Sequence, residues 1–418
     1  MVGSGIFVIP SETIRHCHGY VGLALLAWLI GGVLSVLGAL TYAEMSAMNP
    51  QAGGMYVFVR DAFGPLPAFL YGWVMFFVIG PGTIAALSVA TAGYVDAIIP
   101  LGRAARYGFP PAMIFFLAIV NTVGTKRSAN LTSATTIAKV AVIVALCSLL
   151  LARGQRINLT PLWPEVFTSS LLTSFGVAML GVLWAFEGWQ WVTFAAGDTV
   201  NPQRVLPRGL TISTMLIVAT YMLANLAYLA VLGPTEASNS PRIAAQAVTS
   251  SLGPFAGMII AGTIVVAMFS AVNSGILAIP RLFFVMAQDR LFFPRLAQIH
   301  RRFKTPAASI AALCAMATVY ALTGTFEQLL TYVVFTGWIF YALAACAIFI
   351  FRRRFPEVPR PFRVPGYPLT PVLFIAAAAA IVMNTVVTQP GRAATGLAMV
   401  ASGIPAYYFW RFRQRGAA

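Results

Sequence analysis

A carboxylate and a glycine lie in the middle of a hydrophobic segment of membrane-spanning length. The segment covers about residues 171–196, and its centre reads Leu-Trp-Ala-Phe-Glu-Gly-Trp-Gln over 183–190. An ionisable side chain at the bilayer centre costs at least ~2.5–3.5 kcal/mol, and a glycine weakens a helix by ~1 kcal/mol. A broken helix that lines a polar cavity explains both Glu187 and Gly188, because its freed backbone groups can bind ligand. The competing interpretation is a kinked helix whose Glu187 faces water or a partner.

A second polar break, also interrupted by glycine, lies at the start of the chain. Gly3, Ser4 and Gly5 belong to the first apolar segment, whereas Glu187 belongs to the sixth. Five membrane crossings therefore separate the two breaks. Because five is an odd number, the second set of five segments starts from the opposite side of the membrane. This is the pattern of an inverted repeat with its binding site at two broken helices. We therefore predict one transporter domain over 1–418. Its first repeat covers 1–152, its second repeat covers 171–351, and two added helices cover 369–412.

The composition is that of a membrane protein. Of the 418 residues, 59% are hydrophobic and 9% are charged, and the apolar runs are longer than a soluble core helix requires. We predict an all-α polytopic membrane protein. The net charge of +16 does not indicate nucleic acid binding, because the basic residues lie between the apolar spans. The four cysteines lack metal-ligand spacing, so we predict no metal site, and we expect no cofactor.

Apolar segments recur along the whole chain and predict about twelve transmembrane helices. The first ends near residue 17, and the others lie at about 21–47, 65–100, 109–124, 130–152, 171–197, 208–233, 254–287, 306–323, 327–351, 369–388 and 394–412. The first reaches roughly 25 Å at most, which is short of the ~30 Å hydrocarbon core. We therefore expect helix 1 to be truncated at its N-terminus. Either the true start lies upstream or the first half-helix is missing.

The basic residues predict the orientation in the membrane. An N-terminus in the cytoplasm places most of the 27 lysines and arginines in cytoplasmic loops. The positive-inside rule favours this arrangement. No cleavable signal peptide is evident, because no basic region precedes an apolar run. We predict a multi-pass protein of the plasma (inner) membrane, embedded in the lipid bilayer with both termini in the cytoplasm.

Several motifs, in order and with consistent spacing, resemble the L-type amino acid transporters of the amino acid-polyamine-organocation superfamily, in a prokaryotic-type form. The motifs are Gly3-Ser4-Gly5-Ile6-Phe7-Val8, Gly38-Ala39-Leu40-Thr41-Tyr42-Ala43-Glu44, Gly53-Gly54-Met55-Tyr56, Trp184-Ala185-Phe186-Glu187-Gly188-Trp189, Asn201-Pro202-Gln203-Arg204, Arg281-Leu282-Phe283-Phe284 and Gly403-Ile404-Pro405-Ala406-Tyr407-Tyr408. The resemblance implies a LeuT-like 5+5 inverted-repeat fold with helices 1 and 6 broken. It also implies that amino acids are transported by alternating access.

A zwitterionic amino acid needs donors for its carboxylate and acceptors for its ammonium group. Exposed N–H groups at the broken helix 1 favour an anion, so we assign Gly3, Ser4, Gly5 and Ile6 to the substrate carboxylate. The ammonium group is expected at carbonyls of helix 6, where the predicted binding residues are Trp184, Ala185, Phe186, Glu187 and Gly188. In the family, the position of Trp184 is an aromatic lid over the substrate. Phe186 stands where the family usually has Tyr, so that hydroxyl is absent.

Two charged residues within the spans raise mechanistic hypotheses. Glu187 resembles the acidic residue of family members that accept cationic as well as neutral substrates, and it is also a candidate proton-coupling site. In the family, a lysine at the position of Lys139 fills the space that sodium occupies in LeuT-like symporters and bridges helix 5 to helix 1. A fixed cation repels sodium, so we predict sodium-independent transport. The alternative for Lys139 is a lysine whose side chain extends to the membrane surface.

Our preferred function is sodium-independent amino acid exchange, with cationic as well as neutral amino acids among the substrates. The alternative is a proton-coupled amino acid symporter, and a remote alternative is an amino acid sensor that does not transport. An enzyme is not expected, because no nucleophile, base and orienting group occur together. The external loop over 101–108 lacks the cysteine that links heteromeric relatives to a heavy chain. We therefore expect no disulfide-linked heavy chain and a monomeric protein.

Overall fold

The computed structural model describes residues 5–153, 159–323 and 326–415, and all regular elements within these ranges are helical. Most are α-helices, while η1 is a π-helical segment and η2 and η3 are 3-10 helices. In chain order they are α1 (Gly5–His16), α2 (Val21–Met48), α3 (Met55–Phe63), α4 (Pro65–Val74), η1 (Met75–Ile79), α5 (Gly80–Ile98), α6 (Arg103–Val123), α7 (Thr125–Arg153), α8 (Ser169–Ala185), η2 (Trp189–Asp198), α9 (Pro202–Asn239), α10 (Ile243–Leu252), α11 (Pro254–Gln288), η3 (Pro294–Ala297), α12 (Ala307–Thr323), α13 (Phe326–Arg354), α14 (Leu369–Thr388) and α15 (Pro390–Arg415).

The predicted all-α polytopic class is confirmed. Among the described residues, nine segments are long and apolar enough to cross a membrane. The other three predicted spans correspond to α1, which has 12 residues, α12, which has 17, and α15, whose 26 residues end in a basic turn. The first two are shorter than the ~20 apolar residues of a typical span, and the polar end of α15 lowers its mean hydropathy. The prediction about the start of helix 1 concerns residues 1–4, which lie outside the described part of the chain.

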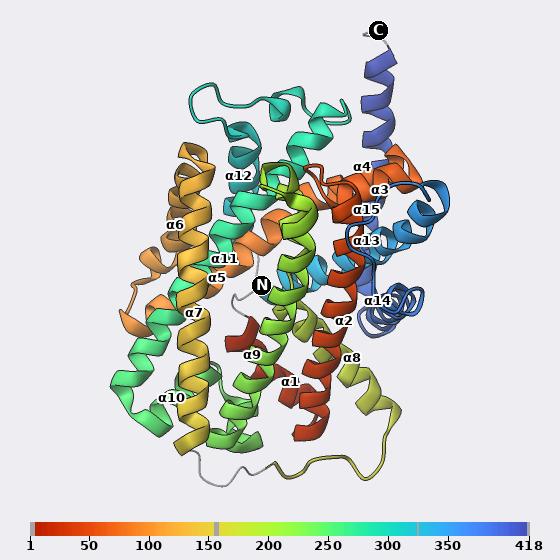
Figure 1. Cartoon of the computed structure of the whole chain (residues 1–418). Helices are drawn as coiled ribbons and strands as arrows, with labels where there is room; N and C mark the ends of the chain where they lie inside the picture. Colours follow the sequence, from red (N-terminus) through yellow and green to blue (C-terminus); the bar gives the residue numbers. More distant parts are fainter. Residues whose placement is uncertain (1–4, 154–158, 324–325, 416–418) are drawn as a thin grey trace.

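The helices pack into one bundle in which segments far apart in sequence meet. The contacting pairs include α2 with α9, α5 with α11, α13 with α14, and α1 with both α8 and α9. In Figure 1, α7 stands at one edge of the bundle and α14 and α15 at the other, with α1, α2, α8 and α9 between them. The long α11 and the α4–α5 segment run obliquely across the same view. The short α1 therefore lies inside the bundle, next to the end of α8.

Polar contacts fasten the short α3 to the end of α11. The Arg60 guanidinium donates to the Asp289 carboxylate at 2.9 Å, and the Tyr56 hydroxyl donates to it at 2.9 Å. Burial, followed by the adjacent Asp289 charge, raises the pKa of the Tyr56 hydroxyl, which therefore stays protonated and keeps donating. This end of the bundle is therefore held by charge-assisted hydrogen bonds.

Candidate functional site

The sixth predicted span is interrupted at Glu187 and Gly188. The helix α8 ends at Ala185, and the 3-10 helix η2 begins at Trp189. Gly188 has φ 101° and ψ −1°, a left-handed conformation that glycine adopts without steric cost. The Glu187 N–H donates to the Trp184 carbonyl at 3.0 Å, which closes the last turn of α8. The break therefore falls where the sequence predicted it.

The first described turn of α1 packs directly against this break. Gly5 contacts the backbone and side chain of Ala185 so closely that a Cβ atom on Gly5 would overlap both. Ile6 is fully buried beside it. The structure thus brings Gly5 and Ile6 together with the end of α8, as predicted. Gly3 and Ser4 lie outside the described residues, and the assignment of these residues to a carboxylate stays a prediction.

Aromatic side chains enclose the end of α8. Trp184 and Phe186 are both buried, and the Phe186 ring packs 5.9 Å from Trp28 of α2 and 5.1 Å from Tyr221 of α9, measured between centroids. The Tyr221 hydroxyl donates to the Ala185 carbonyl at 3.1 Å. One of the carbonyls expected to receive a substrate ammonium group therefore already has a protein donor, although a carbonyl oxygen has a second lone pair.

The Glu187 carboxylate faces α13. Its Oε1 atom accepts a hydrogen bond from the Tyr341 hydroxyl at 2.5 Å and a second, short one from the Gln190 amide. The Gln190 amide also donates to the Tyr341 hydroxyl at 2.7 Å. None of the ion pairs among the described residues includes Glu187. The side chain is therefore buried and held by neutral donors from two elements.

Lys139 lies on α7 and is 4% exposed. Its ammonium group is 3.4 Å from the Ser270 hydroxyl of α11, which also accepts a hydrogen bond from Thr135 at 2.7 Å. The alternative of a side chain that reaches the membrane surface does not hold, because this ammonium group is buried against a neighbouring helix. The predicted bridge to helix 1 is a separate matter and stays a prediction.

The second half of the broken segment is fixed at its far end. Arg281 of α11 donates to the Asp198 carboxylate at 2.6 Å, where η2 ends. At the near end, the Trp189 ring packs 4.9 Å from the Tyr42 ring of α2. The η2 segment is therefore anchored to α11 and α2, and the break at Glu187 and Gly188 lies between these anchors and α8.

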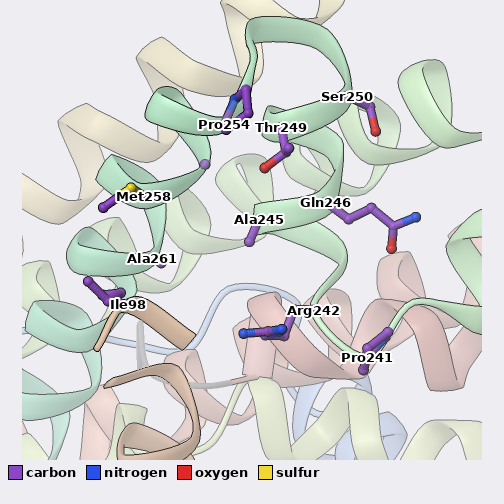
Figure 2. A pocket seen from close by; sticks show the side chains of 11 residues that line it. Ile98, Pro241, Arg242, Ala245, Gln246, Thr249, Ser250, Pro254, Met258 and Ala261 are labelled. Atoms are coloured by element: carbon purple, nitrogen blue, oxygen red, sulfur yellow. The ribbon is translucent and has the colours of Figure 1, made fainter. Parts of the chain in front are cut away.

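A cavity near the C-terminal end of α5 does not coincide with the predicted site. It has a volume of about 340 Å³ and lies between α10 and the first turns of α11. Figure 2 shows Arg242 at the start of α10, with Ala245, Thr249 and Met258 around the same space. None of the predicted substrate residues that the structure describes lines it. The helix break is instead closely packed in this conformation, with Gly5 against Ala185.

Within the described residues, no group of three His, Cys, Asp or Glu side chains could hold a metal ion. The polar groups gathered at the helix break are instead those that suit an organic ligand, with backbone groups, one carboxylate and one amide.

The family model for amino acid permeases matches residues 1–409. The chain belongs to the amino acid permease family. This permease is 30% identical over 99% of its length to the serine/threonine exchanger SteT of Bacillus subtilis, of which the match covers 94%. It is 29% identical over 98% of its length to the human cystine/glutamate transporter, covering 82% of that protein. It is also 30% identical over 93% of its length to the human b(0,+)-type amino acid transporter 1, covering 80% of that protein.

Family membership confirms the resemblance to L-type amino acid transporters and makes this permease a membrane transporter rather than an enzyme. Sequence reasoning missed three residues at the site, namely Gln190, Tyr221 and Tyr341. Gln190 stands only three positions after Glu187, so its polarity in an apolar span was a usable signal. Tyr221 and Tyr341 lie in other spans, and tyrosines are too common in membrane helices to single out either one.

Proposed function

We propose that this permease exchanges amino acids across the membrane without sodium, by alternating access. The observation that carries the proposal is the break between α8 and η2, packed against α1 at Gly5 and Ala185. Broken helices expose N–H and C=O groups that bind the two ends of a zwitterion. The similarity to proteins named as exchangers adds support, since the match to SteT spans almost the whole of both chains.

The substrate carboxylate binds at the start of α1 in this proposal. We assign the carboxylate to the N–H groups of Gly3, Ser4, Gly5 and Ile6, because the dipole at the start of a half-helix favours an anion. The close contact of Gly5 with α8 supports this placement, because it puts the N–H groups proposed for the carboxylate near the carbonyls proposed for the ammonium group of the same substrate. The ammonium group binds near Trp184 and the remaining lone pair of the Ala185 carbonyl.

Sodium independence is attributed to Lys139. A buried ammonium group beside Ser270 puts a fixed positive charge between α7 and α11. Coulomb repulsion at ~4 Å amounts to about 4 kcal/mol at an effective dielectric constant near 20, which is enough to keep a second cation away. In the proposed mechanism Lys139 also links substrate occupancy to movement of helix 1.

Glu187 extends the proposed substrates to cationic amino acids. The carboxylate lies at the break and has no ion-pair partner among the described residues, so a lysine or arginine side chain would supply the missing positive charge. Glu187→Gln is expected to lower transport of lysine and arginine about tenfold or more while leaving leucine transport within about twofold. An equal loss for all three amino acids would contradict this role.

Proton-coupled symport is the second candidate, and the same carboxylate favours it. A buried glutamate without a cationic partner can bind a proton in place of a positive side chain. The two functions differ in what drives uptake, since exchange needs an internal amino acid whereas symport needs a proton gradient.

The deciding experiment is uptake of labelled amino acids into proteoliposomes that contain the full-length protein. Vesicles are either empty or preloaded with alanine, leucine or arginine, and all assays omit sodium. Uptake only into preloaded vesicles supports exchange. Uptake into empty vesicles that grows with an inward proton gradient supports symport, and a requirement for sodium would overturn the role given to Lys139.

The proposed setting is a monomer in the plasma membrane, without a disulfide-linked heavy chain. The basic loops favour a cytoplasmic position for both termini, and no cysteine lies over 101–108. The two breaks favour inverted repeats over 1–152 and 171–351, followed by two helices over 369–412. Labelling of single introduced cysteines from each side of intact cells tests the orientation.

A further inference from the structure

The network around Glu187 joins this carboxylate to Gln190, three positions later, and to Tyr341 of α13, 154 positions away. Tyr341 and Gln190 are each 1% exposed, and Glu187 is 9% exposed. Both donors converge on the same carboxylate oxygen, Oε1. Hydrogen bonds to an ionised group in a low-dielectric site are roughly twice as strong as neutral ones. The network therefore fixes the direction in which the carboxylate points.

One acceptor in this network has no partner among the described residues. The Gln190 Oε1 atom is buried without a hydrogen bond. Reversing the amide would not satisfy it, because Oε1 would then face the Glu187 carboxylate oxygen that the amide nitrogen now contacts. A buried unpaired acceptor costs ~1–3 kcal/mol, and such groups in native proteins call for an explanation. A ligand that carries N–H donors supplies one.

We infer that Tyr341 and Gln190 are positioning residues that select for a cationic substrate side chain. They hold the Glu187 carboxylate next to the Gln190 amide oxygen, so that an ammonium or guanidinium group meets two acceptors and no cationic side chain among the described residues. The inference rests on the proposed transport function and names the residues that give the site its selectivity. Tyr341 contributes through Glu187 and needs no contact with the substrate itself.

Replacing Tyr341 by phenylalanine isolates the hydroxyl. The ring of Tyr341 packs 6.0 Å from Trp338 and 6.4 Å from Trp189, between centroids, and phenylalanine keeps these contacts. The Tyr42 hydroxyl donates to the backbone carbonyl of Tyr341 at 2.9 Å, and this bond is also kept. Tyr341→Phe therefore removes the hydroxyl that donates to Glu187 and accepts from the Gln190 amide, while the ring contacts and the backbone hydrogen bond remain.

The test compares the full-length wild-type protein with Tyr341→Phe and Gln190→Met in the same proteoliposomes. We expect each variant to raise KM for arginine and lysine about tenfold and to leave KM for leucine within about twofold, because a hydrogen bond to a charged group is lost. Tyr320→Phe is the matched control, since it removes a hydroxyl bonded to the Phe77 carbonyl, outside this network. Equal changes for arginine and leucine, or no change for either, would overturn the inference.

A binding measurement on detergent-purified protein separates this inference from the proposed transport function. Arginine and leucine are each titrated, and the shift of the thermal unfolding midpoint is recorded. Wild-type protein that is stabilised by arginine without transporting it would refute the transport proposal but support the site, provided that Tyr341→Phe weakens the arginine shift alone. Protein stabilised by leucine but not by arginine would overturn the site even if leucine is transported.

Discussion

Two buried glutamates in this permease have opposite surroundings. Glu44 of α2 is fully buried, and its carboxylate accepts hydrogen bonds from the Arg352 guanidinium at 2.7 and 2.9 Å and from the Val364 N–H at 2.7 Å. The Arg360 guanidinium lies 3.5 Å away. Glu187 is also buried, but its partners Tyr341 and Gln190 are neutral. Charge compensation, rather than burial, separates the two sites.

The difference indicates which glutamate holds the fold and which is available for function. Glu44 joins α2, α13 and the loop over 355–368 into one clamp, and Arg352 also lies 3.6 Å from the centroid of the Tyr367 ring. Its charge is neutralised within the protein. Glu187 lacks a positive partner among the described residues, and a buried unpaired charge is costly. In the proposed function, a substrate cation or a proton would offset that cost.

The largest expected effect comes from Glu44→Gln. The substitution leaves Arg352 and Arg360 without their buried anion, and breaking a buried pair in this way costs about 3–5 kcal/mol. We expect a clear drop in the thermal unfolding midpoint of the purified protein. Glu165→Gln is the matched control, because Glu165 is exposed, and it should unfold like the wild type. An unchanged midpoint for Glu44→Gln would remove the distinction between the two glutamates.

Gly5→Ala tests whether stability and transport depend on the close packing of α1 against the end of α8, rather than on charge. The added Cβ would overlap the Ala185 backbone, and overpacking of this kind costs about 1–3 kcal/mol. We expect a lower unfolding midpoint and a strong loss of leucine transport, because the added Cβ would push α1 away from α8. Gly209→Ala is the control, since nothing lies within 4 Å of its Cβ position. A stable, fully active Gly5→Ala protein would contradict the close contact.

Tyr42→Phe probes the connection between the two regions. Tyr42 lies two residues before Glu44 and donates from its hydroxyl to the Tyr341 carbonyl at 2.9 Å. Loss of one hydrogen bond is expected to cost about 0.5–1.5 kcal/mol. The unfolding midpoint should therefore fall less than for Glu44→Gln. A loss as large as that of Glu44→Gln would show that the clamp and the Glu187 network form a single unit.

The smallest effect on stability is expected from Glu187→Gln. The amide oxygen of glutamine can accept the hydrogen bond from Tyr341 while the buried charge disappears, so the free energy of unfolding should change by less than about 1 kcal/mol. The measurement is the unfolding midpoint without substrate. The same chemical change is thus expected to lower stability strongly at position 44 and to change it little at position 187. A loss of 3 kcal/mol or more would show that Glu187 has a cationic partner after all.

Much of the fold could be predicted because long apolar spans have few structural solutions. Backbone groups in lipid must be satisfied within the segment, so each span becomes a helix. The break at Glu187 and Gly188 was equally predictable, since a carboxylate and a glycine both disfavour an unbroken helix in a membrane. The number of transmembrane helices was harder to predict, because α1 and α12 are short and α15 is polar at one end.

Side-chain partners could not be predicted in the same way. Tyr341 lies 154 positions from Glu187 and Tyr221 lies 36 positions from Ala185. Nothing in a hydropathy pattern selects one tyrosine among the 14 in the chain. The prediction that the Ala185 carbonyl would be open to the substrate was incomplete for this reason. Its hydrogen bond to Tyr221 depends on how α9 packs against α8.

The sequence alone determined the class of protein, the sites of its helix break and the few charged groups inside the membrane. These features follow from local chemistry, because the cost of a charge or a glycine in a lipid-spanning helix is set by that segment itself. Tertiary structure decided which groups form ion pairs or hydrogen bonds with those charges. Among the described residues, Arg352 and Arg360 form ion pairs with Glu44, whereas the side chains that donate to Glu187 are the neutral Tyr341 and Gln190. Helix packing brings these partners together, and this packing pairs one glutamate with arginines and surrounds the other with neutral donors.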